Sequence, residues 1–324
     1  MDLSIIIVNY RGWKHLRDCL NSIKAFDGKM FDYEVIIVDN NSADGKIDEF
    51  IAEFNSFIFI RNKVNGGFAN GCNLGSTFST GEYLLFLNPD TIASERAVGK
   101  LIENAKAEKR CFISSCNQVN ERNEASTAMG LFPEFGTVTG FGRMMFRLLN
   151  SKKLAKKIQS VNNRIYPDWV SGSVMMIGRK VFNDIGGFDE DFWMYYEDTD
   201  LCRRARDKGG EIVYYTDITI RHIHGGSSRI DRKTASMTKT EVIISRHLYI
   251  AKHMHGLKRS SLLLFLILNN LITGTLMALS GIILFFIPGM FLRVIIYGRL
   301  ISYYASVLKT KSWISSRSVN FLKN

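Results

Sequence analysis

Short apolar runs alternate with helix-like segments through the first third of the chain. Between the first two runs, Trp13, Leu16, Leu20 and Ile23 recur at the spacing of one helix face. Runs that are apolar along their whole length and alternate with helices are typical of parallel strands covered on both faces. The pattern therefore predicts an α/β fold with a mostly parallel, Rossmann-like sheet and flanking helices. The expected strands cover residues 3–8, 33–39, 57–61, 82–88 and 111–115.

The pattern becomes less regular over residues 117–165, which contain glycines and the basic run "RLLNSKKLAKKIQ". We predict an insertion here that is partly helical. Beyond it, the expected elements are a strand, short helix and turn over 168–192, a helix over 197–208, a strand over 211–216, a loop over 221–229 and a helix near 239–255.

The stretch from residue 260 to 292 contains no charged residue. A membrane-spanning helix needs about 20 apolar residues, so one tilted span fits. Asn, Gly and Pro interrupt the stretch, however, and basic residues flank both ends, which favours a re-entrant hairpin or interfacial helices with both ends in the cytoplasm. A buried helix pair of a soluble domain and a dimer interface are the alternatives. We predict a catalytic domain over 1–250 and membrane-associating helices over 251–324.

The net charge of +11 is concentrated in two segments. Residues 252–324 contain nine Lys and Arg and no acid, and residues 135–167 contain seven and no acid. A basic chain can bind nucleic acid or an anionic membrane surface. Nucleic-acid binding predicts basic and aromatic residues interleaved on one face. Here the positive charge borders the uncharged stretch, so the membrane is favoured.

The composition argues against a disordered chain and against a disulfide framework. The chain is 46% hydrophobic, with 22 Phe and 4 Pro in 324 residues, enough to bury a sizeable core in one large or two modest domains. Its five cysteines are odd in number and include no Cys-x-x-Cys pair, which is typical of a reducing compartment. Met1 leads directly into the first apolar run, without the basic segment expected of a secretory signal.

Polar residues follow several of the predicted strands. Ligands of doubly wound sheets bind beyond the carboxyl ends of the strands, and those ends carry Asn9 and Tyr10, residues 39–42, Asn65, and residues 88–90. Asp39 can accept hydrogen bonds from a ribose or a base, or it can form a turn. Tyr10 can cover a base, although a lone tyrosine more often packs in a core.

The Asn-Pro-Asp sequence at residues 88–90 offers a metal ligand. Pro89 ends the strand and presents Asp90 in the expected ligand crevice. A carboxylate there can hold Mg²⁺ or Mn²⁺ against a diphosphate, because these cations also take phosphate oxygens. The alternative is an acid that opens the next helix. Downstream, His222 and His224 are two apart in an extended segment, so one of them can join a metal site, or both lie on a surface loop.

The Gly-rich segment over residues 65–75 can be a phosphate cradle or a loop shaped for close packing. It does not match GxGxxG, and it lacks the lysine of a P-loop. Dinucleotide binding is therefore poorly supported, and the packing role is favoured.

Carboxylates and aromatic rings are adjacent over residues 192–204, "FWMYYEDTDLCRR". Glu197 and Asp198 fall in the first turn of a predicted helix, where the helix dipole alone favours acids. The rings of Trp193, Tyr195 and Tyr196 can offer a surface on which a sugar stacks, and partial desolvation beside them raises the proton affinity of a carboxylate. The segment can therefore be a stabilised helix start or the place of a general base, while Asp200 and Arg204, four apart, are expected to form a supporting pair.

Together and in this order, these motifs resemble one family. The segments "SIIIVNYRG", "VDNNSADG", "NGGFANGCNLG", "YLLFLNPDT" and "RHIHGGSS", with the long run from "WVSGS" to "RARDKG", are similar to the inverting family 2 glycosyltransferases of the GT-A fold, in particular to the bacterial rhamnosyltransferase-like enzymes of cell-wall and O-antigen assembly. The resemblance covers roughly residues 1–250. The combination of "EDTDLCRR" and "NPD" is its most specific part.

The resemblance implies a role for each matching residue. Asp198 is the expected general base, with Glu197 as the alternate, and Asp90 and His222 are the expected ligands of Mg²⁺ or Mn²⁺. Asn88 departs from the family pattern, which has an acid at that place. The donor nucleotide is expected to contact Asn9, Tyr10, Asp39, Asn65, Asn73 and Asn88, and the acceptor Trp169, Gly172 and Trp193.

The activity implied is inverting transfer of a sugar from a nucleoside diphosphate donor to a lipid-linked or polysaccharide acceptor. dTDP-rhamnose is the favoured donor, with UDP- and GDP-sugars open. The implied location is the cytoplasmic face of the bacterial inner membrane, with an undecaprenyl diphosphate glycan as the example of an acceptor. The basic segment 135–167 is either a site for that diphosphate or a solvated loop.

Two other functions compete with this one. A nucleotidyltransferase or another nucleotide-dependent transferase would need a basic, Gly-rich segment directly after the first strand, and "NYRGWKH" is a poor match. A non-catalytic membrane scaffold with a degenerate transferase fold is favoured by Asn88, which stands where the family has an acid.

Overall fold

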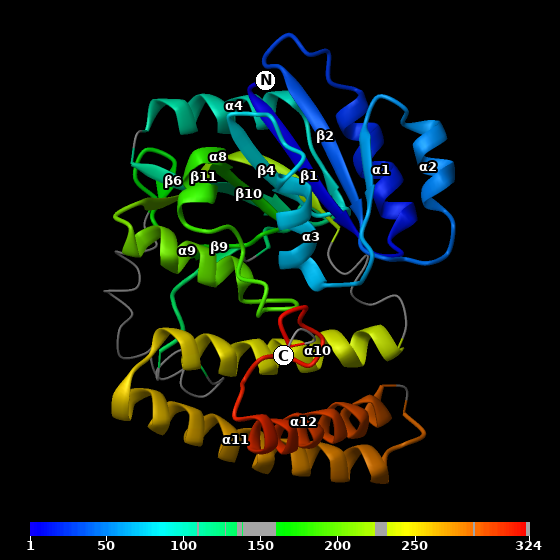
Figure 1. Cartoon of the computed structure of the whole chain (residues 1–324), viewed down its shortest axis with the longest axis vertical. Helices are drawn as coiled ribbons and strands as arrows, with labels where there is room; N and C mark the ends of the chain where they lie inside the picture. The colour runs from blue at the N-terminus through cyan, green and yellow to red at the C-terminus, as the bar shows by residue number, and fades with distance from the viewer. Residues whose placement is uncertain are drawn as a thin grey trace.

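The computed structural model places a β-sheet between helices on both of its faces, with a further layer of three long helices beside this unit (Figure 1). It describes residues 1–108, 110–126, 128–134, 138, 160–223, 232–287 and 289–321.

The strand order of the sheet is β3-β2-β1-β4-β10-β6-β11-β5 in the part of the chain that the structure describes. β1 pairs in parallel with β2 and β4, β2 pairs in parallel with β3, and β10 runs antiparallel between β4 and β6. The first half is the predicted doubly wound sheet, and β10 makes the whole sheet mixed. The strands are β1 (Leu3–Asn9), β2 (Tyr33–Asp39), β3 (Ile58–Arg61), β4 (Tyr83–Leu87), β5 (Thr91–Ile92), β6 (Cys111–Val119), β10 (Val174–Gly178) and β11 (Glu211–His222).

Alternate side chains of the central strands face two hydrophobic cores. Ile5 and Ile7 of β1 pack in the core under α1, α2 and α4, whereas Ile6 and Val8 pack in the core under α3, α8 and α9. Because successive strand residues point to opposite faces, a strand that is apolar at every position needs a cover on both. These helices are α1 (Trp13–Lys24), α2 (Ile47–Glu53), α3 (Gly67–Ser76), α4 (Glu95–Ala107), α8 (Arg179–Asp184) and α9 (Glu197–Asp207).

Two elements extend beyond their predicted bounds. β11 continues to His222 instead of ending at residue 216, and α10 (Arg232–His253) begins before residue 239. Polar residues interrupt the apolar pattern of β11, but a register shift between Tyr215 and Thr219 lets the strand continue alongside β6. The loop predicted from residue 221 is wrong at its start, because His222 ends a strand.

The named elements within residues 117–165, predicted as an insertion, are strands, whereas Val138 is helical and its N–H donates to the Glu134 carbonyl at 3.0 Å. The first residues of the segment complete β6, β7 (Met129–Gly130) pairs with β9 (Trp169–Val170), and β8 (Arg164–Ile165) pairs with β11. The basic run that we predicted to be partly helical lies outside the described residues.

Most of the uncharged stretch lies in one long helix, which forms a helical hairpin with the helix that follows it. α11 (Gly256–Ile283) and α12 (Met290–Thr310) run antiparallel, and a Cβ added to Gly281 would lie 2.6 Å from the Met290 carbonyl oxygen, so glycine permits this close approach. α10 lies between this hairpin and the sheet (Figure 1). It packs Ile244 against Leu300 and Tyr303, and Ile250 against the first turns of α11.

The hairpin presents a large exposed apolar surface. Both helices are long and apolar enough to cross a membrane, and only 28% of the most apolar part of α11 and 17% of that of α12 is buried. Exposed apolar surfaces of this extent mark contact with a membrane or another protein. The exposed side chains are Leu264, Leu268, Ile272, Leu276, Ile283, Phe285, Phe286 and Phe291. The domain division predicted at residue 250 falls inside α10, which packs on both parts.

Candidate active site

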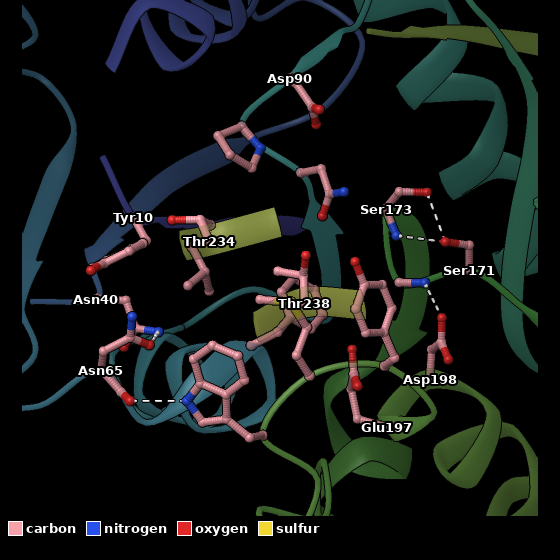
Figure 2. A pocket seen from close by; sticks show the side chains of 18 of the residues that line it. Tyr10, Asn40, Asn65, Asp90, Ser171, Ser173, Glu197, Asp198, Thr234 and Thr238 are labelled. Carbon is pink, nitrogen blue, oxygen red and sulfur yellow. Dashed lines mark hydrogen bonds between the residues drawn. The ribbon is translucent and has the colours of Figure 1, made fainter. Parts of the chain in front are cut away.

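A cavity of about 340 Å³ lies at the carboxyl ends of β1 and β4, the edge where doubly wound sheets bind ligands. Figure 2 shows Asp90 at one end of this cavity and Glu197 and Asp198 at the other, with Tyr10 and Asn65 along one side. The structure therefore gathers predicted site residues from six separate parts of the sequence. The predicted site residues that line the cavity are Tyr10, Asn65, Asn88, Asp90, Gly172, Trp193, Glu197, Asp198 and His222.

A strand pairing brings Asp90 and His222 together. The turn at Pro89 is followed by β5, which pairs with the last residues of β11, so that His222 lies opposite Thr91. His222 Nε2 is 3.1 Å from Asp90 Oδ1, and both side chains are buried. The alternative that Asp90 opens the next helix is wrong, because α4 begins at Glu95 and Ser94 caps it.

The Asp90–His222 pair fits a hard divalent cation. His222 Nδ1 lies 2.9 Å from Gln118 Oε1, which can accept a hydrogen bond from it, and Nε2, 3.1 Å from Asp90 Oδ1, is the ring nitrogen that would ligate a cation. A histidine that ligates a metal is usually oriented by such a bond from its other nitrogen. Mg²⁺ typically takes one or two carboxylates and completes its shell with water and substrate phosphates. Among the described residues, no group of three or more His, Cys, Asp and Glu forms a complete metal site.

Glu197 and Asp198 begin α9 at the opposite end of the cavity. Asp198 Oδ2 accepts from the Gly172 N–H at 3.1 Å, and Oδ1 accepts from the Thr199 N–H at 2.6 Å. Burial raises the pKa of Asp198, although these hydrogen bonds oppose the effect. Burial, followed by the neighbouring charge of Asp198, holds the pKa of Glu197 well above its usual range. The more readily ionised Asp198 is therefore the better candidate for a base, because a protonated carboxyl cannot accept a second proton.

The supporting pair predicted in α9 is present. Arg204 Nε donates to Asp200 Oδ2 at 2.8 Å, and His253 of α10 lies 2.6 Å from the other carboxylate oxygen. Burial acts to raise the pKa of Asp200, but the His253 hydrogen bond and the Arg204 charge outweigh it, so that the pKa is lowered. The contact between Asp200 and His253 ties the helix that carries Asp198 to α10.

Residues 189–196, here called the aromatic loop, form a wall of the cavity in a strained conformation. Tyr195 and Tyr196 both have φ of 68°, a region that bulky side chains rarely adopt. The Trp193 carbonyl accepts from the Phe68 N–H at 2.9 Å, and its indole N–H donates to the Asn65 carbonyl at 3.1 Å. A Cβ on Gly67 would lie 1.8 Å from the Trp193 carbonyl oxygen, so only glycine permits this contact. The Gly-rich segment thus serves close packing, as its sequence favoured.

Four predicted site residues do not line the cavity, and their roles stay predictions. Asn9 accepts from the Gly12 N–H, and Asp39 from the Ser42 N–H, both in turns that follow strands. Asn73 donates to the Phe188 carbonyl and accepts from its N–H, which ties α3 to the chain before the aromatic loop. Trp169 donates to the Leu131 carbonyl. His224 lies outside the described residues.

Several lining residues carried no sequence signal. Thr234 and Thr238 come from the first turns of α10, where the apolar pattern is weak, and Met237 lies beside them. Their spacing of four places the two threonines on one helix face, but nothing in the local sequence directs that face to a distant strand edge. The other lining residues that we did not single out are Val8, Phe68, Ser171, Ser173 and Met194, whereas Asn40 belongs to the strand end expected at the site.

Comparison with known proteins agrees with this geometry. Residues 4–182 match the model of glycosyl transferase family 2. The chain belongs to this family. The family 2 glycosyltransferase also matches, over residues 152–225, a model described as the N-terminal domain of galactosyltransferase. Its predicted α/β fold of GT-A type and its predicted enzyme class are thereby confirmed.

Relatives of this glycosyltransferase act in glycan biosynthesis. It is 29% identical over 210 residues to the low-salt glycan biosynthesis hexosyltransferase Agl10 of Haloferax volcanii, a match that covers 63% of this chain and 62% of that protein. It is 25% identical over 218 residues to the rhamnosyltransferase WbbL of Escherichia coli, which covers 65% of this chain and 79% of that one. The match thus spans less than two thirds of the first relative.

Two solved structures share the fold. One is GalNAc-T7 with UDP, GalNAc and Mn²⁺, at a TM-score of 0.55 and 16% identity, over 82% of this glycosyltransferase and 53% of that chain. The other is S. aureus TarS, at a TM-score of 0.53 and 15% identity, over 79% of this chain and 41% of that one.

Proposed function

We propose that this glycosyltransferase inverts the anomeric configuration of a sugar as it moves it from a nucleoside diphosphate, with dTDP-rhamnose the favoured donor, to a lipid-linked glycan. One observation carries the proposal: a single cavity has the Asp90–His222 pair at one end and the Glu197–Asp198 pair at the other. A donor whose diphosphate lies at the first pair would present its sugar toward the second.

The chemistry follows from these two ends. Asp90 and His222 would hold Mg²⁺ or Mn²⁺, which when bound stabilises the charge that develops on the leaving nucleoside diphosphate. Asp198 takes the proton of the acceptor hydroxyl while that oxygen bonds to the anomeric carbon. The bond from that carbon to the phosphate oxygen breaks on the opposite face, which inverts the configuration. Asn65 and Tyr10, which line the side of the cavity, would contact the nucleoside.

The relatives' names support the choice of donor and acceptor. WbbL is a rhamnosyltransferase. A 54-residue segment is 41% identical to the N-acetylglucosaminyl-diphospho-decaprenol L-rhamnosyltransferase of Mycobacterium tuberculosis, over 17% of this chain and 18% of that protein. That name specifies a lipid diphosphate acceptor, which agrees with the exposed apolar hairpin.

A thermal-shift panel of nucleotide sugars tests the donor. We expect dTDP-rhamnose with Mn²⁺ to raise the unfolding midpoint more than either alone, because a ligand of the native state adds about 2.7 kcal/mol at a hundred times its Kd. UDP- and GDP-sugars are tested as the alternative donors, and free rhamnose, which lacks the nucleoside diphosphate, is the control. If no nucleotide sugar moves the midpoint at millimolar concentration, the proposed function is wrong.

We further propose that the hairpin lies on the cytoplasmic leaflet of the membrane. Its two helices lie side by side under α10, on the side away from the sheet (Figure 1), and Lys258, Arg293 and Lys309 are available for anionic headgroups. An interfacial helix binds through buried apolar area and charge attraction together. This arrangement agrees with the basic ends of the uncharged stretch.

Flotation with vesicles of phosphatidylethanolamine and phosphatidylglycerol tests the hairpin. We expect the wild type to float and the double variant Ile272→Asp/Leu276→Asp to bind at least tenfold more weakly, since each buried apolar side chain contributes about 1.5–3 kcal/mol. These side chains are 62% and 63% exposed. Phe78→Asp, at a 50% exposed position of the catalytic unit, is the matched control and should float like the wild type. Equal flotation of all three proteins would contradict the assignment.

A further inference from the structure

The chain after α12 returns to the active site. Lys311 adopts φ of 59° and reverses the chain direction, and residues 312–321, here called the C-terminal strap, then run past α10 toward the aromatic loop (Figure 1, red). The sequence offered no pattern for this segment, and the function proposed above does not use it.

The strap is fixed to the helical layer on one side. Trp313 stacks on His247 of α10, with ring centroids 5.5 Å apart and planes 9° apart, and Tyr303 of α12 donates to the Trp313 carbonyl at 2.9 Å. Glu241 of α10 is 2% exposed and accepts from Ser315 Oγ at 2.9 Å. The strap therefore has little freedom relative to α10 and α12.

On its other side the strap holds the aromatic loop. Ser318 Oγ donates to the Glu190 carbonyl at 2.8 Å, and Asn320 donates to the Asp191 carboxylate at 2.8 Å. The Arg317 guanidinium carbon lies 5.5 Å from the centre of the Trp193 ring. A cation over a tryptophan face is attracted by the ring quadrupole, and an arginine can stack on the ring as well.

Arg317 joins these two sets of contacts. Its Nε lies 3.3 Å from Glu241 Oε1, so a buried carboxylate on α10 anchors the same guanidinium that covers Trp193. The indole N–H is fixed by its hydrogen bond to the Asn65 carbonyl. Trp193 is thus held between a donor-side backbone and an arginine from the end of the chain.

The contacts that hold Trp193 lie next to the strained residues of the aromatic loop. Strained φ/ψ values such as those of Tyr195 and Tyr196 cost about 1–3 kcal/mol each and persist only where the surroundings fix them. Glu197 and Asp198 follow directly in α9. A shift of the aromatic loop would therefore move both the Trp193 wall and the carboxylate pair.

We propose that Arg317 is a positioning residue for sugar transfer, which acts through Trp193 by fixing the aromatic loop against the donor side of the cavity. The inference rests on the proposed function for its catalytic part only. The placement of the loop is a property of the chain that can be measured without substrate.

Amide hydrogen exchange in full-length Arg317→Ala measures that placement. We expect peptides covering residues 189–196 to exchange about three- to thirtyfold faster, the range that the strength of a cation–π contact implies, while peptides of β1 and β2 keep their rates. Lys14→Ala, which removes an exposed charge from α1, is the matched control and should leave the loop unchanged. Unchanged exchange of the loop in Arg317→Ala overturns the proposal.

Kinetics in a double-variant cycle test the route through Trp193. We expect Arg317→Ala to lower kcat/KM about tenfold in the wild-type background and to have little further effect in Trp193→Leu, because the residue acts through that ring. Arg317→Lys keeps the positive charge toward Glu241, but its ammonium group cannot stack on the indole ring, so its kcat/KM should lie between those of the wild type and Arg317→Ala. This variant replaces Arg317→Ala in the cycle if the alanine variant does not fold. Additive losses would overturn the inference. A wild type without transfer would instead refute the proposed function, and hydrogen exchange would still decide the role of Arg317.

Discussion

The Asp198→Asn variant is expected to lose sugar transfer by about 10²–10⁴-fold, the usual contribution of a general base. The amide keeps the shape of the side chain and can keep an oxygen toward the Gly172 N–H, but it cannot take the proton of the acceptor hydroxyl. Donor affinity should stay near that of the wild type, because Asp198 lies at the opposite end of the cavity from Asp90. Single-turnover transfer and donor titration on the same preparation separate the two effects.

Glu197→Gln is the matched variant for this experiment. The pKa of Glu197 is held well above its usual range, so the neutral glutamine mimics the protonated form and should cost far less than Asp198→Asn. The pH profile adds a second check. Because burial raises the pKa of Asp198, the pH at which wild-type kcat is half-maximal should lie above the pKa of an ordinary aspartate. Below that pH Asp198 is protonated and kcat should be lost. If Glu197→Gln were the inactive protein and Asp198→Asn the active one, the base would be Glu197.

The Asp90→Asn variant should show the second-largest loss, about 10²–10³-fold in transfer at fixed Mn²⁺, since a metal stabilises a leaving group by several kcal/mol. Unlike Asp198→Asn, it should weaken donor binding as well. It should also raise the Mn²⁺ concentration needed for half-maximal rate, because a carboxylate oxygen is replaced by a weaker ligand. A titration of Mn²⁺ against the initial rate measures both effects.

A control variant and a second variant of the proposed metal site accompany this experiment. Asp217→Asn removes a partly exposed carboxylate from the same strand as His222 and should leave the Mn²⁺ dependence unchanged. His222→Gln should shift the Mn²⁺ dependence in the same direction as Asp90→Asn, since the two side chains are 3.1 Å apart. A normal Mn²⁺ dependence in Asp90→Asn would place the cation elsewhere or show that transfer does not need one.

The sheet was predictable because the apolar residues of each strand indicate which of its faces are buried. β1, β2 and β4 are apolar at nearly every position, and that pattern has one common explanation, a strand covered on both faces. The cavity followed from the same argument, since the polar residues at the ends of parallel strands must meet at one edge. Asp90, at the end of β4, was found in this way.

The remaining features depend on contacts between distant segments. His222 faces Asp90 only because a bulge extends β11 past polar residues and β5 then pairs with its end. Asn73 has the residue type of a ligand contact, yet its amide ties α3 to the Phe188 backbone. Arg317 lies in a segment without periodicity. A local pattern shows that such residues are polar, but not which partner they meet.

The position of α10 fixes the separation between the cavity and the apolar hairpin. One face of this helix lines the cavity with Thr234 and Thr238, and another packs on α12 through Ile244. The cavity that Glu197 and Asp198 line is thus separated from the apolar hairpin by α10, a layer about one helix diameter, 10–12 Å, thick. An acceptor whose lipid stays in the bilayer would reach Asp198 only with a hydroxyl at a matching distance from its anchor, so the enzyme would measure the length of the growing glycan by geometry alone.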